Sequence, residues 1–280
     1  MRASQQMPLP FAFPAPRCGI GCLGSGSKGN GTLVSLDGRL FLVDCGFALW
    51  DVEARLARVG VDPREIAAIL ITHEHTDHAS GASALARRYG ISVYASAGTR
   101  SALSWRAVDV RTFDAADRFS IGDVEIEPVV VPHDAREPTQ FVLHGASGRV
   151  GVLTDLGEIP DRVKRAYETC DALLIEANHS PRMLWSGTYP FVLKRRIASP
   201  LGHLANEQTV AALSEMSLKP SAAVLIGHVS QQNNDVRELK RLFAPLRSRW
   251  PMLALATQSG SAEWYAPACG QSRPEAAPTL

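Results

Sequence analysis

The stretch that decides the fold is "ILITHEHTDHASG", residues 69–81, in which an apolar run leads directly into a cluster of histidines and carboxylates. The apolar part predicts a buried strand, and His73 and His75, two positions apart just beyond it, project in the same direction. Asp77 and His78 lie where the turn enters a helix and face a second point. Imidazole together with carboxylate suits Zn, Mn or Fe. The stretch therefore predicts a metal site at a strand end.

This stretch contains more potential ligands than one metal ion uses. Zinc usually takes four ligands, whereas two metals that share a carboxylate could use all of them. The zinc-protease motif HExxH does not fit, because the fourth position after His73 is Asp77 and the segment follows a strand. Two metals are therefore favoured over a helical zinc-protease site.

The composition excludes several classes of protein. The 280 residues are 45% hydrophobic, enough for one large domain or two small ones, and the net charge of +1 gives no global field that recruits nucleic acid or acidic membrane. No apolar run reaches transmembrane length. The five scattered cysteines favour reduced thiols in a cytoplasmic protein. Prolines interrupt residues 1–17, which we expect to be a flexible leader. We expect residues 266–280 to be a flexible tail.

Strands and helices alternate between these ends. Hairpins are predicted at 32–46, around Asp37 and Gly38, and at 140–155. Further strands are predicted at 66–72, 91–96, 124–134, 171–179, 222–228 and 252–258, and helices at 51–60, 79–90, 161–170, 206–217 and 234–249. The two halves run in a similar order without a visible sequence repeat, so any duplication is structural only. This order predicts sheets covered by helices.

Polar residues follow most of these strands, where α/β proteins build their sites. Six of the eight histidines lie at strand ends: His73, His75, His78, His133, His179 and His228. Asp134 and Asp155 occupy similar places. A single histidine of this kind is usually a satisfied polar residue. That interpretation does not explain why so many share one position.

The pattern H-x-H-x-D-H after a buried strand resembles the signature of the metallo-β-lactamase superfamily. The later residues His133, Asp155 and His228 follow in the order of that family's remaining ligands, and Asp44 in "FLVDCG" matches its early aspartate. The resemblance covers roughly residues 18–265. It implies a single αββα sandwich domain, in which two mixed β-sheets are flanked by helices.

The resemblance also implies roles for individual residues and a cofactor of two divalent ions, Zn²⁺ or Mn²⁺. His73, His75 and His133 would bind the first metal, and Asp77, His78 and His228 the second. Asp155 would bridge them, and His203 would protonate the departing oxygen. Asp77, Asp155 and His203 are thus the expected catalytic residues. Asp44 would order the ligand loop, and Glu176 would orient a ligand imidazole.

Several segments, among them "GSGSKGNGTLV", "EANHSPRML" and "GHVSQQNN", resemble the YycJ/WalJ-like subfamily. Its members are DNA exonucleases with a link to DNA repair, so the resemblance implies a 5′-to-3′ DNA exonuclease with nucleic acid, DNA in particular, as its partner. The chain also resembles ribonuclease Z, in which a histidine corresponding to His203 assists the leaving group. From His203 the sequence reads His-Leu-Ala-Asn, whereas ribonuclease Z has His-Ser-Thr. This difference argues against a tRNA-processing role.

Contacts to substrate are predicted in two segments. Asn178 and His179 lie beside the site, and His179 is either a substrate contact or a structural histidine. Lys194, Arg195 and Arg196 form either a solvated face or a grip on a backbone phosphate. "GSGSKGNG" fits G-x-G-x-x-G, but a strand follows it, so it predicts a turn with exposed N–H groups near the metals rather than a dinucleotide site.

Three functions compete at this point. The first is a two-metal nuclease, and the second is a metallo-hydrolase of a cyclic phosphodiester or a thioester, which the modest net charge favours. The third is a metal-holding scaffold without activity. The presence of all the expected ligand residues and of His203 argues against it. The sequence leaves open the metal, the polarity of cleavage and the oligomeric state, and it predicts no membrane partner.

Overall fold

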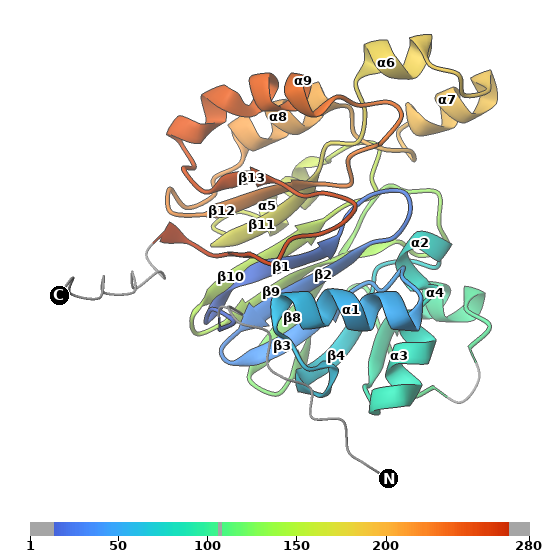
Figure 1. The fold of residues 1–280 in the computed structure, drawn as a ribbon, viewed down its shortest axis with the longest axis vertical. Coiled ribbons are helices and arrows are strands. Elements are labelled where there is room, and N and C mark those ends of the chain that lie inside the picture. The colour runs from blue at the N-terminus through green and yellow to red at the C-terminus, as the bar shows by residue number, and fades with distance from the viewer. Residues whose placement is uncertain (1–13, 106–107, 269–280) are drawn as a thin grey trace, which may run out of the picture.

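A computed structural model describes residues 14–105 and 108–268 of the chain. Two seven-stranded sheets pack face to face, and helices cover the outer face of each sheet (Figure 1). This arrangement confirms the predicted sandwich of two mixed sheets between helical layers. Most of the predicted leader and tail, residues 1–17 and 266–280, lies outside the described residues.

Each sheet is built largely from one half of the chain. The first has the order β14-β1-β2-β3-β4-β5-β6 and the second β13-β12-β11-β10-β9-β8-β7. The strands are β1 (Cys18–Gly24), β2 (Gly31–Leu36), β3 (Arg39–Val43), β4 (Ile66–Ile71), β5 (Val93–Ser96), β6 (Val110–Phe113), β7 (Phe119–Ile121), β8 (Val124–Val130), β9 (Thr139–Gly145), β10 (Gly148–Leu153), β11 (Ala172–Glu176), β12 (Ala223–Gly227), β13 (Leu253–Leu255) and β14 (Trp264–Tyr265).

The pairing pattern repeats between the two sheets. In the first sheet the pairs β14–β1, β1–β2 and β2–β3 are antiparallel, and those from β3 to β6 are parallel. In the second the pairs from β7 to β10 are antiparallel, and those from β10 to β13 are parallel. The similar order of the two halves thus corresponds to a matching topology.

The helices fall into three groups. Those of the first half are α1 (Leu49–Val59), α2 (Thr76–Ala79), α3 (Ala82–Tyr89) and α4 (Ala97–Ala102), with the 3₁₀ turn η1 (Pro63–Glu65). Those packed on the second sheet are α5 (Asp161–Ala166), α8 (Asn206–Glu215) and α9 (Val236–Phe243), followed by η2 (Ala244–Ser248). The pair α6 (Pro181–Ser186) and α7 (Phe191–Ile197) extends beyond the sandwich (Figure 1). None of the helices in the described chain is long and apolar enough to span a bilayer.

Three apolar layers hold these elements together. Side chains such as Phe41, Leu70, Phe141 and Leu225 are fully buried between the two sheets. A second layer joins the first sheet to α1 and α3, and a third joins the other sheet to α5, α8 and α9. The central parallel strands are buried on both faces, which is why "IAAILI" and "AVLIG" read as continuous apolar runs. These layers fix the strand ends that carry the site.

The differences from the predicted elements have local causes. The prediction missed β1, whose sequence "CGIGCLG" is rich in glycine, and the short strands β6, β7 and β14. It also missed α2, α4, α6 and α7, which have four to seven residues each and are too short for a helical period. The predicted helix at 234–249 divides at Phe243, because Pro245 follows.

The described cysteines support the expected thiol state. Cys18, Cys22, Cys45 and Cys170 are all unpaired and buried. Burial raises the pKa of the Cys45 thiol to about 12, so it is a protonated packing residue. Cys269 lies outside the described residues.

Candidate metal centre

The predicted ligands come together at one end of the sandwich. β4 carries three of the predicted histidines and Asp77 just beyond its carboxyl end, and β8, β10 and β12, which run parallel to one another, precede His133, Asp155 and His228. The donor atoms form overlapping groups in which all atoms lie within 4.8 Å of one another. All seven predicted ligands belong to these groups, although they come from four separate segments of the chain.

The first group consists of His73, His75 and His133. The ring centroids of His73 and His75 are 4.5 Å apart, and that of His133 is 4.9 Å from His73. Nδ1 of His133 lies 3.2 Å from the carbonyl oxygen of Gly202, and its Nε2 lies 3.4 Å from Nδ1 of His75. His73 and His75 therefore project in the same direction, as predicted.

The second group consists of Asp77, His78 and His228. Oδ2 of Asp77 lies 3.5 Å from Nε2 of His78 and 3.8 Å from Nε2 of His228. Asp155 lies between the groups, 3.2 Å from Nε2 of His78 and 3.5 Å from Nε2 of His228, and it also forms a group with His73 and His78. One carboxylate thus reaches both ligand sets.

Backbone conformation directs three of the site residues inward. Asp44, Asp155 and His228 have φ values of 61°, 55° and 49°, in the left-handed region that residues other than glycine rarely adopt. Hydrogen bonds hold two of these turns: the N–H of Asp155 donates to Glu176, and the N–H of His228 donates to Oγ of Ser25. Conformations of this kind are characteristic of functional sites held by the surrounding structure.

Asp44 connects the first sheet to the ligand loop. Its carboxylate accepts hydrogen bonds from the N–H and hydroxyl of Thr72, and Oδ2 lies 2.7 Å from Nδ1 of His78. It therefore fixes the ring of His78 with Nε2 facing the other ligands. Asp44 thus joins the end of β3 to the segment after β4, and its role in ordering metal ligands stays a prediction.

The same loop is packed without space for a side chain. A Cβ atom on Gly46 would lie 1.8 Å from the carbonyl oxygen of Asp77, and one on Gly81 would lie 1.7 Å from that of Phe47. The backbone after β3 therefore rests directly on the backbone of the ligand loop. Only glycine permits this approach.

Glu176 lies beneath the other side of the site and is fully buried. Its carboxylate accepts the N–H of Asp155 at 2.6 Å and that of Leu204 at 2.8 Å. It also lies 3.2 Å from Nδ1 of His228 and 3.3 Å from Nδ1 of His203. One carboxylate thus contacts two imidazoles and the backbone of Asp155.

The charges of the site depend on one another. Burial opposes charge on His228, but the nearby carboxylates of Asp155, Asp77 and Glu176 outweigh it and raise the pKa of His228 to about 10. Burial likewise opposes charge on Glu176, yet His203 and His228 lower its pKa to about 2. Burial and the neighbouring imidazoles hold the pKa of His73 well below its usual value. The carboxylates therefore favour positive charge at the centre of the site.

The unsatisfied atoms of the site fit bound cations. Nε2 of His73, Nε2 of His228 and Oδ2 of Asp155 are buried and have no hydrogen-bond partner. Buried polar groups normally have partners, and each exception requires an explanation. A neutral imidazole nitrogen and a carboxylate oxygen are ligands for divalent ions. The donor set therefore fits divalent metal ions.

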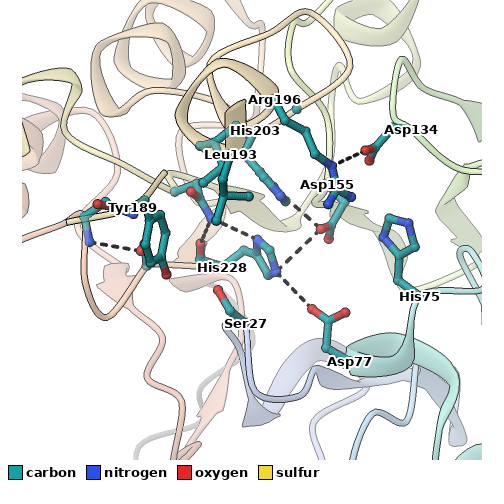
Figure 2. A pocket seen from close by; sticks show the side chains of 15 residues that line it. Ser27, His75, Asp77, Asp134, Asp155, Tyr189, Leu193, Arg196, His203 and His228 are labelled. Atoms are coloured by element: carbon teal, nitrogen blue, oxygen red, sulfur yellow. Dashed lines mark hydrogen bonds and ion pairs between the residues drawn. The ribbon is translucent and has the colours of Figure 1, made fainter. Parts of the chain in front are cut away.

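A pocket opens over the ligands (Figure 2). Its volume is about 250 Å³, and its lining includes His75, Asp77, Asp155 and His228 at the base. Tyr189, Leu193 and Arg196 line another side, and His203 lies beside Asp155 and His228, as Figure 2 shows. The pocket therefore lies between the metal-ligand cluster and the α6–α7 segment.

The structure separates the predicted substrate contacts. Asn178 and Arg196 line the pocket, and Arg196 pairs with Asp134 at its rim. His179 is 2% exposed and is absent from the lining. Lys194 and Arg195 are also absent from it, and the ammonium of Lys194 donates to the carbonyls of Trp185 and Gly187.

Several residues at the site escaped the sequence reasoning. Ser27, Tyr189 and Leu193 line the pocket. Nδ2 of Asn30 lies 3.0 Å from Nε2 of His78. Ser27 and Asn30 belong to the "GSGSKGNG" turn, which was expected near the metals and is followed by β2, as predicted. Tyr189 and Leu193 carry no comparable signal, because an apolar residue near a short helix resembles any packing residue.

Comparison with known proteins agrees with this geometry. The family described as "Beta-lactamase superfamily domain" matches residues 39–228, which contain every predicted ligand. The chain belongs to the metallo-β-lactamase superfamily. Relatives named as exodeoxyribonucleases match most of its length. This metallo-β-lactamase-fold chain is therefore a metal-dependent hydrolase.

The curated relatives confirm the resemblance to the YycJ/WalJ-like group. The chain is 35% identical to exodeoxyribonuclease YycJ of Bacillus anthracis over 225 residues, which cover 79% of this chain and 85% of the relative. It is also 35% identical to exodeoxyribonuclease WalJ of Streptococcus pneumoniae over 232 residues, covering 79% and 84%. The crystal structure of YhfI from Bacillus subtilis, a metallo-β-lactamase fold protein, matches with a TM-score of 0.65 at 15% identity, over 86% of this chain and 97% of that one. That likeness concerns the fold alone.

Proposed function

We propose that this protein is a two-metal phosphodiesterase that degrades DNA from a 5′ end, with a role in DNA repair. The observation that carries the proposal is the position of Asp155, whose carboxylate reaches both ligand groups. The exodeoxyribonucleases that match most of the chain support DNA as the substrate. That the chain is a metal-dependent hydrolase of this family is established. We propose the number of metal ions, the substrate and the direction of cleavage.

The ligands divide between two ions as the groups suggest. His73, His75 and His133 would hold one Zn²⁺ or Mn²⁺ ion, and Asp77, His78 and His228 would hold the other, with Asp155 shared. Bound divalent ions in such a pair acidify water and neutralise charge on a phosphoryl group. Asp44 and Glu176 keep the ligand rings in place through their Nδ1 atoms.

His203 would supply the proton to the departing oxygen. Its Nδ1 faces Glu176 at 3.3 Å, and its ring lies on the wall of the pocket with 21% of the side chain exposed. Nδ1 is therefore held by a carboxylate, and Nε2 is left to exchange a proton with a substrate. The ring also stacks on His228 with centroids 5.1 Å apart, which places it beside the ligands.

Arg196 would contact the phosphate next to the cleaved bond. It lines the pocket, and the partner of its guanidinium is Asp134 at the rim. A phosphate oxygen competes well for a guanidinium, since the planar fork matches its geometry. Asp134 thus keeps Arg196 in place until a phosphate enters.

A second candidate is hydrolysis of a small cyclic phosphodiester or a thioester. The small cavity volume, about 250 Å³, favours this candidate. Cleavage of RNA in the manner of ribonuclease Z is a third candidate. The sequence His-Leu-Ala-Asn at His203 weighs against it.

The proposal is tested with duplex DNA labelled at the 5′ or the 3′ end, in Mn²⁺ and in Zn²⁺, beside the Asp155→Ala variant. Stepwise shortening by the wild type alone is expected, and the labelled end gives the direction. If metal-loaded wild type cleaves a cyclic dinucleotide but leaves every labelled DNA intact, the second candidate replaces the first. Labelled RNA in a parallel reaction tests the third.

A further inference from the structure

The α6–α7 segment, residues 181–202, forms a ledge over the proposed active site. It extends beyond the sandwich in Figure 1, and in Figure 2 its Tyr189, Leu193 and Arg196 form one side of the pocket. A substrate strand that leaves the pocket on this side must pass along the ledge. Its surface chemistry therefore bears on what the enzyme accepts.

The ledge concentrates exposed apolar side chains. Of the seven large apolar side chains exposed in the described chain, four lie here: Trp185 at 47%, Phe191 at 65%, Val192 at 79% and Leu201 at 51%. The rings of Trp185 and Phe191 have centroids 6.1 Å apart at a tilt of 47°. A cluster of this kind on a soluble surface marks an interaction site.

The backbone under these side chains is firmly built. Leu184 is fully buried, and the ammonium of Lys194 donates to the carbonyls of Trp185 at 2.9 Å and of Gly187 at 2.6 Å, which ties α7 to the end of α6. A Cβ atom on Gly202 would lie 2.2 Å from the carbonyl oxygen of Arg196, so the end of the ledge packs against α7. The aromatic rings are thus presented by an ordered scaffold.

The charge of the ledge selects its partner. Residues 181–202 contain four Lys or Arg residues and no Asp or Glu, in a chain whose net charge is +1. Arg182 pairs with Glu238 at 3.1 Å, whereas Arg195 is exposed and forms no ion pair among the described residues. Exposed aromatic rings among cations suit a polyanion with flat faces, since bases stack on the rings while phosphates meet the charges.

We propose that Trp185 and Phe191, here called the aromatic platform, stack unpaired bases of the nucleic acid whose phosphate occupies the pocket. The inference deepens the proposed nuclease function and rests on it. Bases present their faces to a protein only when they are unstacked from a duplex, so the enzyme acts on a single-stranded or frayed end. Tyr189 lies between the two platform residues in sequence and lines the pocket, so the segment that carries the platform also reaches the pocket.

The test compares two double variants of the full chain. Trp185→Leu/Phe191→Leu keeps an apolar surface and removes the rings, whereas Trp185→Phe/Phe191→Tyr keeps rings of a different kind. Affinity is measured by anisotropy with a labelled, nuclease-resistant phosphorothioate oligonucleotide. Neither platform residue lines the pocket. Hydrolysis of bis(p-nitrophenyl) phosphate, which carries no nucleobase, therefore reports on the active site separately.

The leucine variant should lose roughly 5- to 150-fold in oligonucleotide affinity for each base that no longer stacks. Its KM for single-stranded DNA should rise while turnover of the small diester is retained, and the aromatic variant should bind like the wild type. Unchanged oligonucleotide affinity in the leucine variant would overturn the inference. The oligomeric state then distinguishes the alternative. If the wild type is a dimer and Trp185→Asp/Phe191→Asp is a monomer, the ledge joins two copies of the chain. If the wild type hydrolyses the small diester but no nucleic acid, the proposed function fails, and the platform with it.

Discussion

Replacing Glu176 with glutamine should weaken metal binding without touching a proposed ligand. The carboxylate accepts the N–H groups of Asp155 and Leu204 on separate oxygens, at 2.6 and 2.8 Å. Glutamine keeps one oxygen and replaces the other with an NH₂ group. Whichever oxygen is replaced, one buried N–H loses its acceptor, which costs about 1–3 kcal/mol of folding free energy.

The effect on the metal follows from the imidazoles. Nδ1 of His228 lies 3.2 Å from the carboxylate, and losing that negative charge makes the ring a poorer and less well oriented ligand. Loss of such a partner lowers metal affinity about 10- to 100-fold, equivalent to about 1.4–2.8 kcal/mol. The same change at Glu158, an exposed carboxylate, should leave affinity unchanged.

The assay is competition for Zn²⁺ or Mn²⁺ with a chromogenic chelator, together with urea unfolding of the same samples. The expected result is a lower metal affinity and a lower free energy of unfolding in Glu176→Gln, with Glu158→Gln matching the wild type. A folded Glu176→Gln protein with wild-type metal affinity would refute the role given to this carboxylate.

Three further changes test other parts of the structure. Gly46→Ala should push the backbone of Asp77 away and lower metal affinity roughly tenfold or more, since its Cβ would meet the Asp77 carbonyl oxygen at 1.8 Å; normal binding in a chelator competition would contradict this packing. Phe141→Ala should lower the free energy of unfolding by about 3–5 kcal/mol in urea, because the ring is fully buried between the sheets. The hydroxyl of Ser147, with backbone N–H groups, lowers the pKa of Asp37 below its usual 3.8, so this carboxylate stabilises the fold above that pH and ceases to do so as the pH falls through its lowered value. Asp37→Asn should therefore cost about 1 kcal/mol at pH 7, and urea unfolding should show the difference closing in acid; a difference independent of pH would contradict the assignment.

The sequence identified the residues that the structure brings together at the site, because their chemistry and their position are both unusual. Their role as metal ligands stays a prediction. Histidine and aspartate follow several of the buried strands, and in a sandwich with parallel strands those ends meet at one edge. The alternation of strands and helices predicted sheets covered by helices, and the family resemblance implied the αββα sandwich. His73, Asp155 and His228 could therefore be grouped before any geometry was known, with the family resemblance supplying their division between metals.

The pocket wall could not be predicted in the same way. Tyr189 and Leu193 lie on an excursion whose helices are six and seven residues long, below the length at which a helical period is visible. The sequence grouped Lys194 with Arg196, but the bonds of Lys194 to two carbonyls depend on how α6 and α7 fold back on each other. The left-handed turn at Asp155 likewise depends on the buried Glu176, which is distant in sequence.

The central claim, two metals joined by Asp155 in a nuclease, is tested most directly by one titration. Metal-free protein is given increasing Mn²⁺ or Zn²⁺, and bound metal by native mass spectrometry and cleavage of end-labelled DNA are followed on the same samples. We predict two equivalents bound, with cleavage appearing as the second binds, and loss of both features in Asp155→Ala. Cleavage that is complete at one equivalent, or two bound equivalents without cleavage of any DNA, would contradict the account.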